Sequence, residues 1–76
     1  MLEHVATEDI CVRLGKRVRA LRKERLWRQD DLAQHAGLTR TYLSNLERGN
    51  KNPSLRSLEI LAETFGKTVG ELLMEL

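Results

Sequence analysis

Apolar residues first recur at the spacing of an α-helix between residues 9 and 26. Successive members are four, four and three positions apart, so they fall in one stripe along a helical surface. The stripe consists of Ile10, Leu14, Val18 and Leu21. The pattern predicts a first helix over this segment, with the stripe turned toward a core.

Two short helices joined by a glycine turn are predicted next, over residues 29–36 and 39–48. Gly37 can take the left-handed conformation that closes the first of them. The Thr39 hydroxyl can accept a hydrogen bond from an unpaired backbone N–H, and so begin the second. Their inward-facing residues are Leu32, Ala33, Ala36, Leu43 and Leu46.

Two further helices are predicted after a polar loop. Ser54 can cap the first of them, which Gly66 ends. Thr68 and Glu71 have the spacing of a capping box, which begins the last helix over residues 68–76. The residues expected on the buried side of the fourth helix are Leu55, Leu58, Leu61, Ala62 and Phe65, and the last helix carries the apolar residues Val69, Leu72, Leu73 and Leu76. Since there is no strand pattern, the predicted fold is all-α with five helices.

The length of the chain leaves room for one domain, residues 1–76, with a modest core. Residues 1–8 are expected to form a loose N-terminal tail. No apolar run approaches the roughly 18 residues needed to cross a bilayer, and the N-terminus lacks the pattern of a signal peptide. A single cysteine cannot pair within the chain, which favours a reducing, cytoplasmic location.

Basic residues gather in the first helix, although the formal net charge is only +2. The cluster comprises Arg13, Lys16, Arg17, Arg19, Arg22, Lys23 and Arg25. Such a cluster is typical either of a solvated helix face or of a surface that binds nucleic acid. Charge alone leaves both interpretations open.

The residues available argue against an enzyme. Catalysis needs a nucleophile, an acid–base pair or a metal arranged in a pocket. His4 and His35 are isolated, with no ligand spacing around either. Cys11 is expected to be an ordinary helical residue rather than a reactive thiol. We therefore expect no catalytic residue, metal, cofactor or small-molecule ligand.

Residues 29–49 read QDDLAQHAGLTRTYLSNLERG. Two short helices at a tight glycine turn form the geometry that lays the second helix into the major groove of DNA. The segment resembles the lambda-repressor/Cro-like helix-turn-helix family, also called the Xre family, in its Gln, two acids, Leu-Ala, turn Gly, Thr N-cap and final Glu-Arg-Gly. The resemblance covers about residues 10–73. It implies a five-helix lambda-repressor-like DNA-binding domain whose helix-turn-helix occupies residues 29–48.

Base-contacting residues are expected on the exposed face near the start of the recognition helix, because only that face reaches base edges. With two leucines turned inward, this face carries Arg40, Thr41, Ser44 and Asn45. Arg40 can fork onto guanine, Asn45 can pair with adenine, and Thr41 can touch a thymine methyl group. The alternative is that these side chains are merely solvated.

Phosphate contacts are expected from residues that flank the recognition helix, because backbone contacts fix its register. The candidates are Arg17, Arg28, Gln29, Thr39, Tyr42, Arg48, Asn50 and Lys51. The resemblance implies that Gln29 points a backbone N–H and its amide at a phosphate. Tyr42 is equally compatible with a partly buried core position. Arg28 stands where the family has a Ser or Thr N-cap, so one cap hydrogen bond is lost and a cation opposes the helix dipole.

Two further implications of the resemblance concern the scaffold. Arg22 and Glu47 match family positions that meet as a partly buried ion pair between the first and third helices. Trp27 replaces an aliphatic residue and is expected to pack in the core. Leu26 stands where glycine is common, which leaves the turn between the first two helices undefined.

A two-fold dimer is expected on the last helix and part of the fourth, which would read a palindromic operator in double-stranded DNA. The last helix carries more apolar residues than so small a core needs, and others lie off the main stripes. The expected interface residues are Ile60, Val69, Leu72, Leu73, Met74 and Leu76.

A chain of this length without a sensor domain, with the run at residues 40–44, resembles the controller proteins of restriction-modification systems. The resemblance implies a dimeric, sequence-specific transcription regulator. A phage-type or antitoxin-type repressor, and a protein-interaction module on the same fold, remain alternatives.

Overall fold

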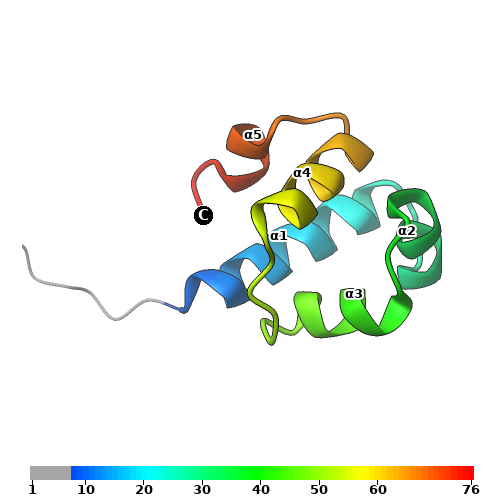
Figure 1. Cartoon of the computed structure of the whole chain (residues 1–76), viewed down its shortest axis with the longest axis horizontal. Helices are drawn as coiled ribbons and strands as arrows, with labels where there is room; N and C mark the ends of the chain where they lie inside the picture. Colours follow the sequence, from blue (N-terminus) through cyan, green and yellow to red (C-terminus); the bar gives the residue numbers. More distant parts are fainter. Residues whose placement is uncertain (1–7) are drawn as a thin grey trace, which may run out of the picture.

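The computed structural model describes residues 8–76, which form five helices (Figure 1). The helices are α1 (Ile10–Glu24), α2 (Gln29–Ala36), α3 (Arg40–Glu47), α4 (Leu55–Thr64) and α5 (Val69–Leu73). The predicted all-α fold is confirmed, since this part of the chain contains no strand. Apart from Glu8, the expected N-terminal tail lies outside the described residues, as does His4.

The side chains predicted to cap the N-termini of α3, α4 and α5 do so. Thr39 Oγ1 accepts a hydrogen bond from the backbone N–H of Tyr42 at 3.0 Å, where α3 begins. Ser54 caps α4 in the same way. At α5, Thr68 and Glu71 form both hydrogen bonds of the predicted capping box, at 3.0 and 2.8 Å. These bonds satisfy backbone N–H groups that have no partner within the helix.

Helices α1 and α5 end earlier than predicted, whereas α2 ends as predicted at Gly37. The helical pattern of α1 stops at Glu24, and Leu26 takes a positive φ of 58°. That left-handed backbone cannot continue a right-handed helix. Likewise, α5 stops at Leu73 because the backbone of Met74 is extended.

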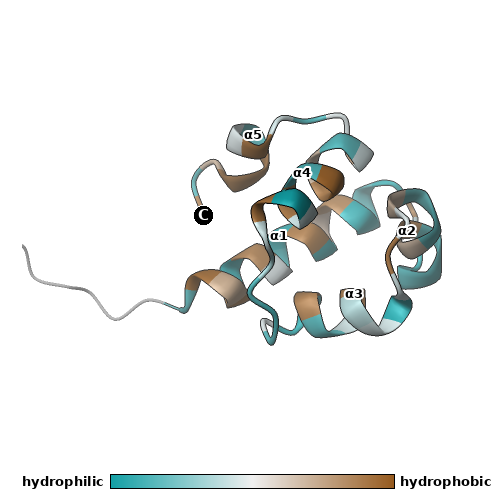
Figure 2. Ribbon diagram, viewed as in Figure 1, coloured by the Kyte–Doolittle hydropathy of each residue, from teal (hydrophilic) through white to brown (hydrophobic). Residues whose placement is uncertain are grey.

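The core lies around α1, which runs between α3 and α5 (Figure 1). Apolar and polar segments alternate along the helices, as one buried face per helix requires (Figure 2). The buried apolar residues are Leu14, Val18, Leu21, Leu32, Ala33, Leu43, Leu46, Leu58, Leu61, Ala62, Phe65 and Leu72. Every helix therefore contributes at least one side chain to a single core.

Two apolar residues predicted to face the core are instead exposed. Ile10 is 55% exposed and Leu55 is 79% exposed. Each is the first residue of its helix, one turn before the buried stripe begins. Helical spacing places them on the correct face, but no neighbouring element covers that first turn.

Helix α5 belongs to the core of a single chain. Leu72 is fully buried, while Val69, Leu73 and Leu76 are partly buried against the core. The expectation that Leu72 is surplus to the core and forms a dimer interface is therefore wrong, because it has no surface left to offer. The reason is that α5 folds back onto the other helices and places Leu72 among their buried side chains.

Two arginines of α1 hold the end of α5. The Arg13 guanidinium donates to the carbonyl oxygen of Leu76 at 2.8 Å. Arg17 donates to the carbonyl oxygens of Leu72 and Met74 at 3.1 and 2.5 Å. The carbonyl group of Leu72 is in the last turn of α5, where acceptors lack a helical N–H partner, and those of Met74 and Leu76 follow the end of the helix. The two arginines therefore pair acceptors that the helix itself leaves unpaired.

Helices α1 and α3 approach most closely at Gly15, which is buried. A Cβ atom placed there would collide with the carbonyl oxygen of Leu46, and it would lie 2.7 Å from that of Glu47. The backbone of α3 thus rests directly on α1. This contact fixes how far α3 stands from the rest of the domain.

Candidate nucleic-acid interface

A polar groove runs along the exposed side of α3. Its volume is about 330 Å³, and its lining residues are Gln29, Arg40, Thr41, Ser44 and Arg48. Leu43 and Leu46, on the opposite side of the helix, are fully buried and fix which face points outward. The structure therefore brings three of the four predicted base-contacting residues together with two predicted phosphate-contacting residues.

The fourth predicted base reader, Asn45, lies on the same helix but is already engaged by a neighbour. Arg48 donates to its Oδ1 atom at 2.7 Å. This bond joins a predicted base reader to a predicted phosphate contact, one turn apart on α3. It leaves the amide NH₂ group of Asn45 without a partner among the hydrogen bonds of the described residues.

Arg40 projects from the start of α3 toward α2. Its Nε atom lies 3.6 Å from Oδ1 of Asp30, and the two side chains are 67% and 58% exposed. Sequence reasoning did not single out Asp30 as a site residue. The two residues are ten positions apart on different helices, so no helical spacing relates them.

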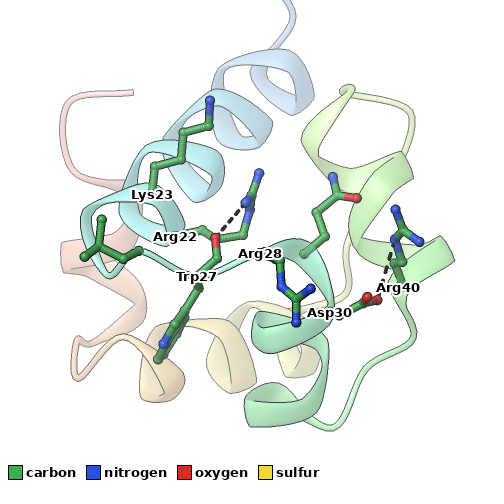
Figure 3. Close-up of a pocket in the computed structure, with 8 residues that line it drawn as sticks. Arg22, Lys23, Trp27, Arg28, Asp30 and Arg40 are labelled. Atoms are coloured by element: carbon green, nitrogen blue, oxygen red, sulfur yellow. Dashed lines mark hydrogen bonds and ion pairs between the residues drawn. The ribbon is translucent and has the colours of Figure 1, made fainter.

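A second, larger hollow of about 530 Å³ lies where the end of α1 meets the starts of α2 and α3 (Figure 3). We call it the basic hollow. It is lined by Arg22, Lys23, Leu26, Trp27, Arg28, Gln29, Asp30 and Arg40. Four of these eight residues are cationic, so the hollow favours an anion. Lys23 was noted only as part of the basic cluster, and nothing in its local sequence pointed to this hollow.

Arg28 begins α2 without a side-chain cap, as predicted, because a guanidinium cannot accept a hydrogen bond. Asp31 supplies the return half of the cap, accepting from the backbone N–H of Arg28 at 2.8 Å. That hydrogen bond is the main reason that the pKa of Asp31 lies below its ordinary value. The Arg28 side chain is 80% exposed, and its Nε atom lies 3.6 Å from Oδ2 of Asp31.

The predicted ion pair between Arg22 and Glu47 is confirmed. Arg22 donates from Nε and Nη2 to the two carboxylate oxygens at 2.7 and 2.9 Å. The side chains are only 10% and 4% exposed. Arg22 also donates to the carbonyl oxygen of Trp27 at 2.9 Å, and the Gln29 amide donates to Glu47 at 3.1 Å. Hydrogen bonding to the carboxylate raises the pKa of Arg22 above its ordinary value.

This network ties α1, α2 and α3 together beneath the groove. The Gln29 amide nitrogen, predicted to face a phosphate, is used inside the protein by Glu47. The Gln29 backbone N–H is the first of α2, where an N–H group lacks an intrahelical acceptor. The network therefore positions Gln29 at the junction of the groove and the basic hollow, both of which it lines.

A sequence model described as helix-turn-helix matches residues 18–72. The chain belongs to this helix-turn-helix family. It is 50% identical over 62 residues to the HTH-type transcriptional regulator DdrOP3 of Deinococcus deserti, covering 82% of this chain but only 48% of that regulator. The chain thus spans about half the length of this curated relative.

Two solved structures of similar proteins share the helix-turn-helix fold. The restriction-modification controller protein C.AhdI from Aeromonas hydrophila is 37% identical, with a TM-score of 0.77 over 82% of this chain and 94% of that one. SinR, a master regulator for biofilm formation solved in complex with DNA, is 36% identical, with a TM-score of 0.73 over 79% of this chain and 97% of that one. The predicted lambda-repressor-like fold of five helices is confirmed.

Of the remaining predicted phosphate-contacting residues, three lie in or just after α3 and one does not. Tyr42 is half-buried against the core, and the Lys51 ammonium lies 5.4 Å from the centre of its ring. Asn50 is exposed just beyond the end of α3. Arg17 is separated from this group, because its guanidinium is bound to the end of α5 on the other side of α1.

Trp27 occupies the turn that precedes the helix-turn-helix unit and packs against the core, as expected from the sequence. Its ring stacks on His35 at 4.3 Å between centroids and lies 6.1 Å from Phe65. Leu26 beside it is 91% exposed. The left-handed backbone of Leu26 explains why glycine is common at this position in the family.

Residues 8–76 contain no group of three His, Cys, Asp or Glu side chains that could hold a metal ion. No helix in that range is long and apolar enough to cross a membrane. Partial burial and the neighbouring Asp9 raise the pKa of the Cys11 thiol, which is the opposite of what a reactive thiolate requires.

Proposed function

We propose that the protein is a transcription regulator that binds double-stranded DNA with α3 in the major groove. The observation that carries the proposal is the polar face of α3, which is fixed from behind by two fully buried leucines and flanked by cations. An α-helix fits the major groove, and residues near its N-terminus reach the base edges. The solved complex of SinR with DNA supports this proposal.

In this arrangement the base readers are those on the outer face of α3. Arg40 donates two hydrogen bonds to a guanine, and Thr41 contacts a thymine methyl group. Asn45 presents its NH₂ group to a base, while Arg48 holds its oxygen. Ser44, which is half-buried, lines the groove between these readers.

The DNA backbone is held on both sides of that face. The proposed phosphate contacts are Arg28, Gln29, Thr39, Tyr42, Arg48, Asn50 and Lys51. Arg28 and Gln29 line the basic hollow at the start of α2, Arg48 lines the groove at the end of α3, and Asn50 and Lys51 follow it along the chain. We assign Arg17 instead to holding α5, because α5 carbonyl groups already occupy its guanidinium.

Dimerisation is proposed through the outer sides of α4 and α5. Met74 is 57% exposed, and Ile60, Val69, Leu73 and Leu76 are partly exposed. A hollow of about 430 Å³ beside them is lined by Leu55, Arg56, Glu59 and Val69. Its opposite charges suit a two-fold interface, because Arg56 of each copy would face Glu59 of the other. Two α3 helices about 34 Å apart would then read inverted half-sites of a palindromic operator.

The DNA-binding proposal is tested by selecting duplexes from a random-sequence library and measuring the affinity of the bound fraction at several salt concentrations. We expect affinity to fall steeply as salt rises, because phosphate contacts release counterions. We also expect the selected duplexes to contain an inverted repeat. Binding that is absent, or that does not respond to salt, would overturn the proposal and favour a protein-interaction module.

Within this class, we propose a controller of a restriction-modification system, acting in the cytoplasm. The proposal is supported by the likeness to C.AhdI, of which this chain covers 94%. Selected duplexes that match sequence upstream of an adjacent restriction or modification gene would support it. A match upstream of a toxin gene or a phage lysis–lysogeny region would replace it with an antitoxin-type or phage-type repressor.

The exposed position of Met74 gives a prediction for the dimer. Met74→Glu is expected to shift the protein toward monomers in sedimentation and to weaken operator binding, because a charge would be buried at the two-fold interface. Glu75→Gln, at an exposed neighbouring position, serves as the control and is expected to leave the assembly unchanged. A Met74→Glu protein that sediments and binds like the parent would contradict this interface.

Arg40 and Lys51 are expected to lose DNA affinity in different ways. Arg40→Ala removes a base contact, so it should cost about 1 to 3 kcal/mol per half-site on the selected operator and little on a scrambled duplex. Lys51→Ala should weaken both duplexes alike and reduce the salt dependence by roughly one counterion per contact. Binding series on the two duplexes at several salt concentrations measure both effects. Equal losses on both duplexes for Arg40→Ala would place Arg40 among the phosphate contacts.

A further inference from the structure

Arg40 lies between two surfaces that suit different parts of DNA. It lines the groove along α3, where base edges are proposed to lie, and it also lines the basic hollow, where phosphates are favoured. The side chain is 67% exposed and long enough to serve either surface. A free arginine at this point would bind any DNA backbone as readily as a chosen base.

The Asp30 carboxylate limits that freedom. It lies 3.6 Å from Nε of Arg40, the inner nitrogen of the guanidinium (Figure 3). Figure 3 shows the outer end of the guanidinium turned away from the carboxylate. Contact at Nε leaves both terminal nitrogens available, and these suffice for the two parallel hydrogen bonds to guanine.

Asp30 and its neighbour Asp31 make different contacts. Asp31 is bound to the backbone N–H of Arg28 and closes the start of α2. Among residues 8–76, the only ion pair of Asp30 is the one with Arg40. Asp30 is also 58% exposed beside the basic hollow, where its charge repels DNA phosphates. A carboxylate in the first turn of α2 stabilises that helix, but at this place it also lowers affinity for DNA in general.

We propose that Asp30 is a specificity-determining positioning residue, which holds the Arg40 guanidinium toward the bases and away from the phosphates. The inference rests on the proposed function, because it assumes that Arg40 reads a base. Its signature is a pair of opposite effects. Removing the Asp30 charge should raise affinity for DNA of any sequence while it lowers discrimination at the base pair that Arg40 reads.

The test compares the parent protein with Asp30→Asn, using duplexes selected from a random-sequence library by the parent. Each is measured on the selected duplex, on duplexes with single base-pair changes, and on a scrambled duplex. For Asp30→Asn we expect discrimination at the Arg40 base pair to fall about two- to fivefold, the range expected from an exposed ion pair. Affinity for the scrambled duplex should rise, and preferences at the other base pairs should stay as they are.

Two controls separate positioning from charge and from folding. Glu63→Gln removes the same charge from an exposed site on α4, away from Arg40, and should leave discrimination unchanged. In an Arg40→Ala background, Asp30→Asn should no longer alter discrimination at that base pair, because there is no guanidinium to position. Circular dichroism melting confirms that each variant keeps the helix content and the folding transition of the parent.

The outcomes distinguish this inference from the function on which it rests. Parent protein that binds no duplex overturns the proposed function. Asp30→Asn that raises affinity equally on all duplexes, with discrimination intact, overturns the positioning role and leaves DNA binding standing. Asp30→Asn that binds the selected duplex with improved discrimination also overturns it, because Asp30 would then compete with guanine for Arg40.

Discussion

Glu47→Ala is expected to lower the free energy of unfolding by about 3 to 5 kcal/mol, because it strands a buried charge. The Arg22 side chain is only 10% exposed, and two of its guanidinium nitrogens donate to Glu47. Without the carboxylate, one hydrogen bond to the carbonyl oxygen of Trp27 remains. The Gln29 amide loses its acceptor as well. Urea unfolding followed by circular dichroism measures the loss.

Glu63→Ala is the matched control, since Glu63 is an exposed glutamate within α4, and its effect should lie within about 0.5 kcal/mol. Replacing Arg22 and Glu47 together by leucine should restore part of the stability, because no unpaired charge is left behind. A loss below about 1 kcal/mol for Glu47→Ala would mean that water reaches the Arg22 guanidinium and screens it.

The helices could be predicted because their signals are local. Gly37, Thr39 and Thr68 act on backbone groups within a few positions of themselves, so the sequence determines where those helices begin or end. The polar face of α3 follows from its two buried leucines in the same way. The candidate base readers therefore follow from the sequence alone.

Features that depend on distant segments could not be derived from spacing. Periodicity gives the face of a helix but not where its neighbour ends, which is why Leu55 was expected inside and lies outside. The count of apolar residues in α5 did not reveal that Leu72 completes the core. The pairing of Asp30 with Arg40 joins two helices through the turn between them, and neither residue alone signals the other.

The basic cluster of α1 shows the same limit. Its cations look alike in the sequence, but a helix turns them toward different neighbours. Arg13 and Arg17 bind carbonyl groups at the end of α5, whereas Arg22 is paired with Glu47 beneath the groove. Lys23 lines the basic hollow. Arg13, Arg17 and Arg22 therefore hold helices together, whereas Lys23 lies on the side proposed to face DNA.

Gly15→Ala is expected to destabilise the fold by about 3 kcal/mol or more, although alanine favours helices over glycine by about 1 kcal/mol. The added Cβ would collide with the carbonyl oxygen of Leu46 and lie 2.7 Å from that of Glu47. These are backbone atoms of α3, so relief requires the whole helix to move. Because α3 carries the proposed base readers and Glu47, DNA affinity should fall together with stability. Thermal unfolding and operator binding measure the two effects.

Gly70→Ala provides the matched control for this prediction. Gly70 lies in α5, and a Cβ atom there would meet only Thr68 Oγ1 at 3.8 Å, which is ordinary van der Waals contact. The same substitution at Gly70 should therefore stabilise the protein by about 0.5 to 1 kcal/mol, through helix propensity and the smaller entropy of the unfolded chain. Opposite signs at the two glycines would attribute the loss at Gly15 to the contact between α1 and α3. A stabilising Gly15→Ala would show that α3 can shift outward at little cost, which would contradict a rigidly seated recognition helix.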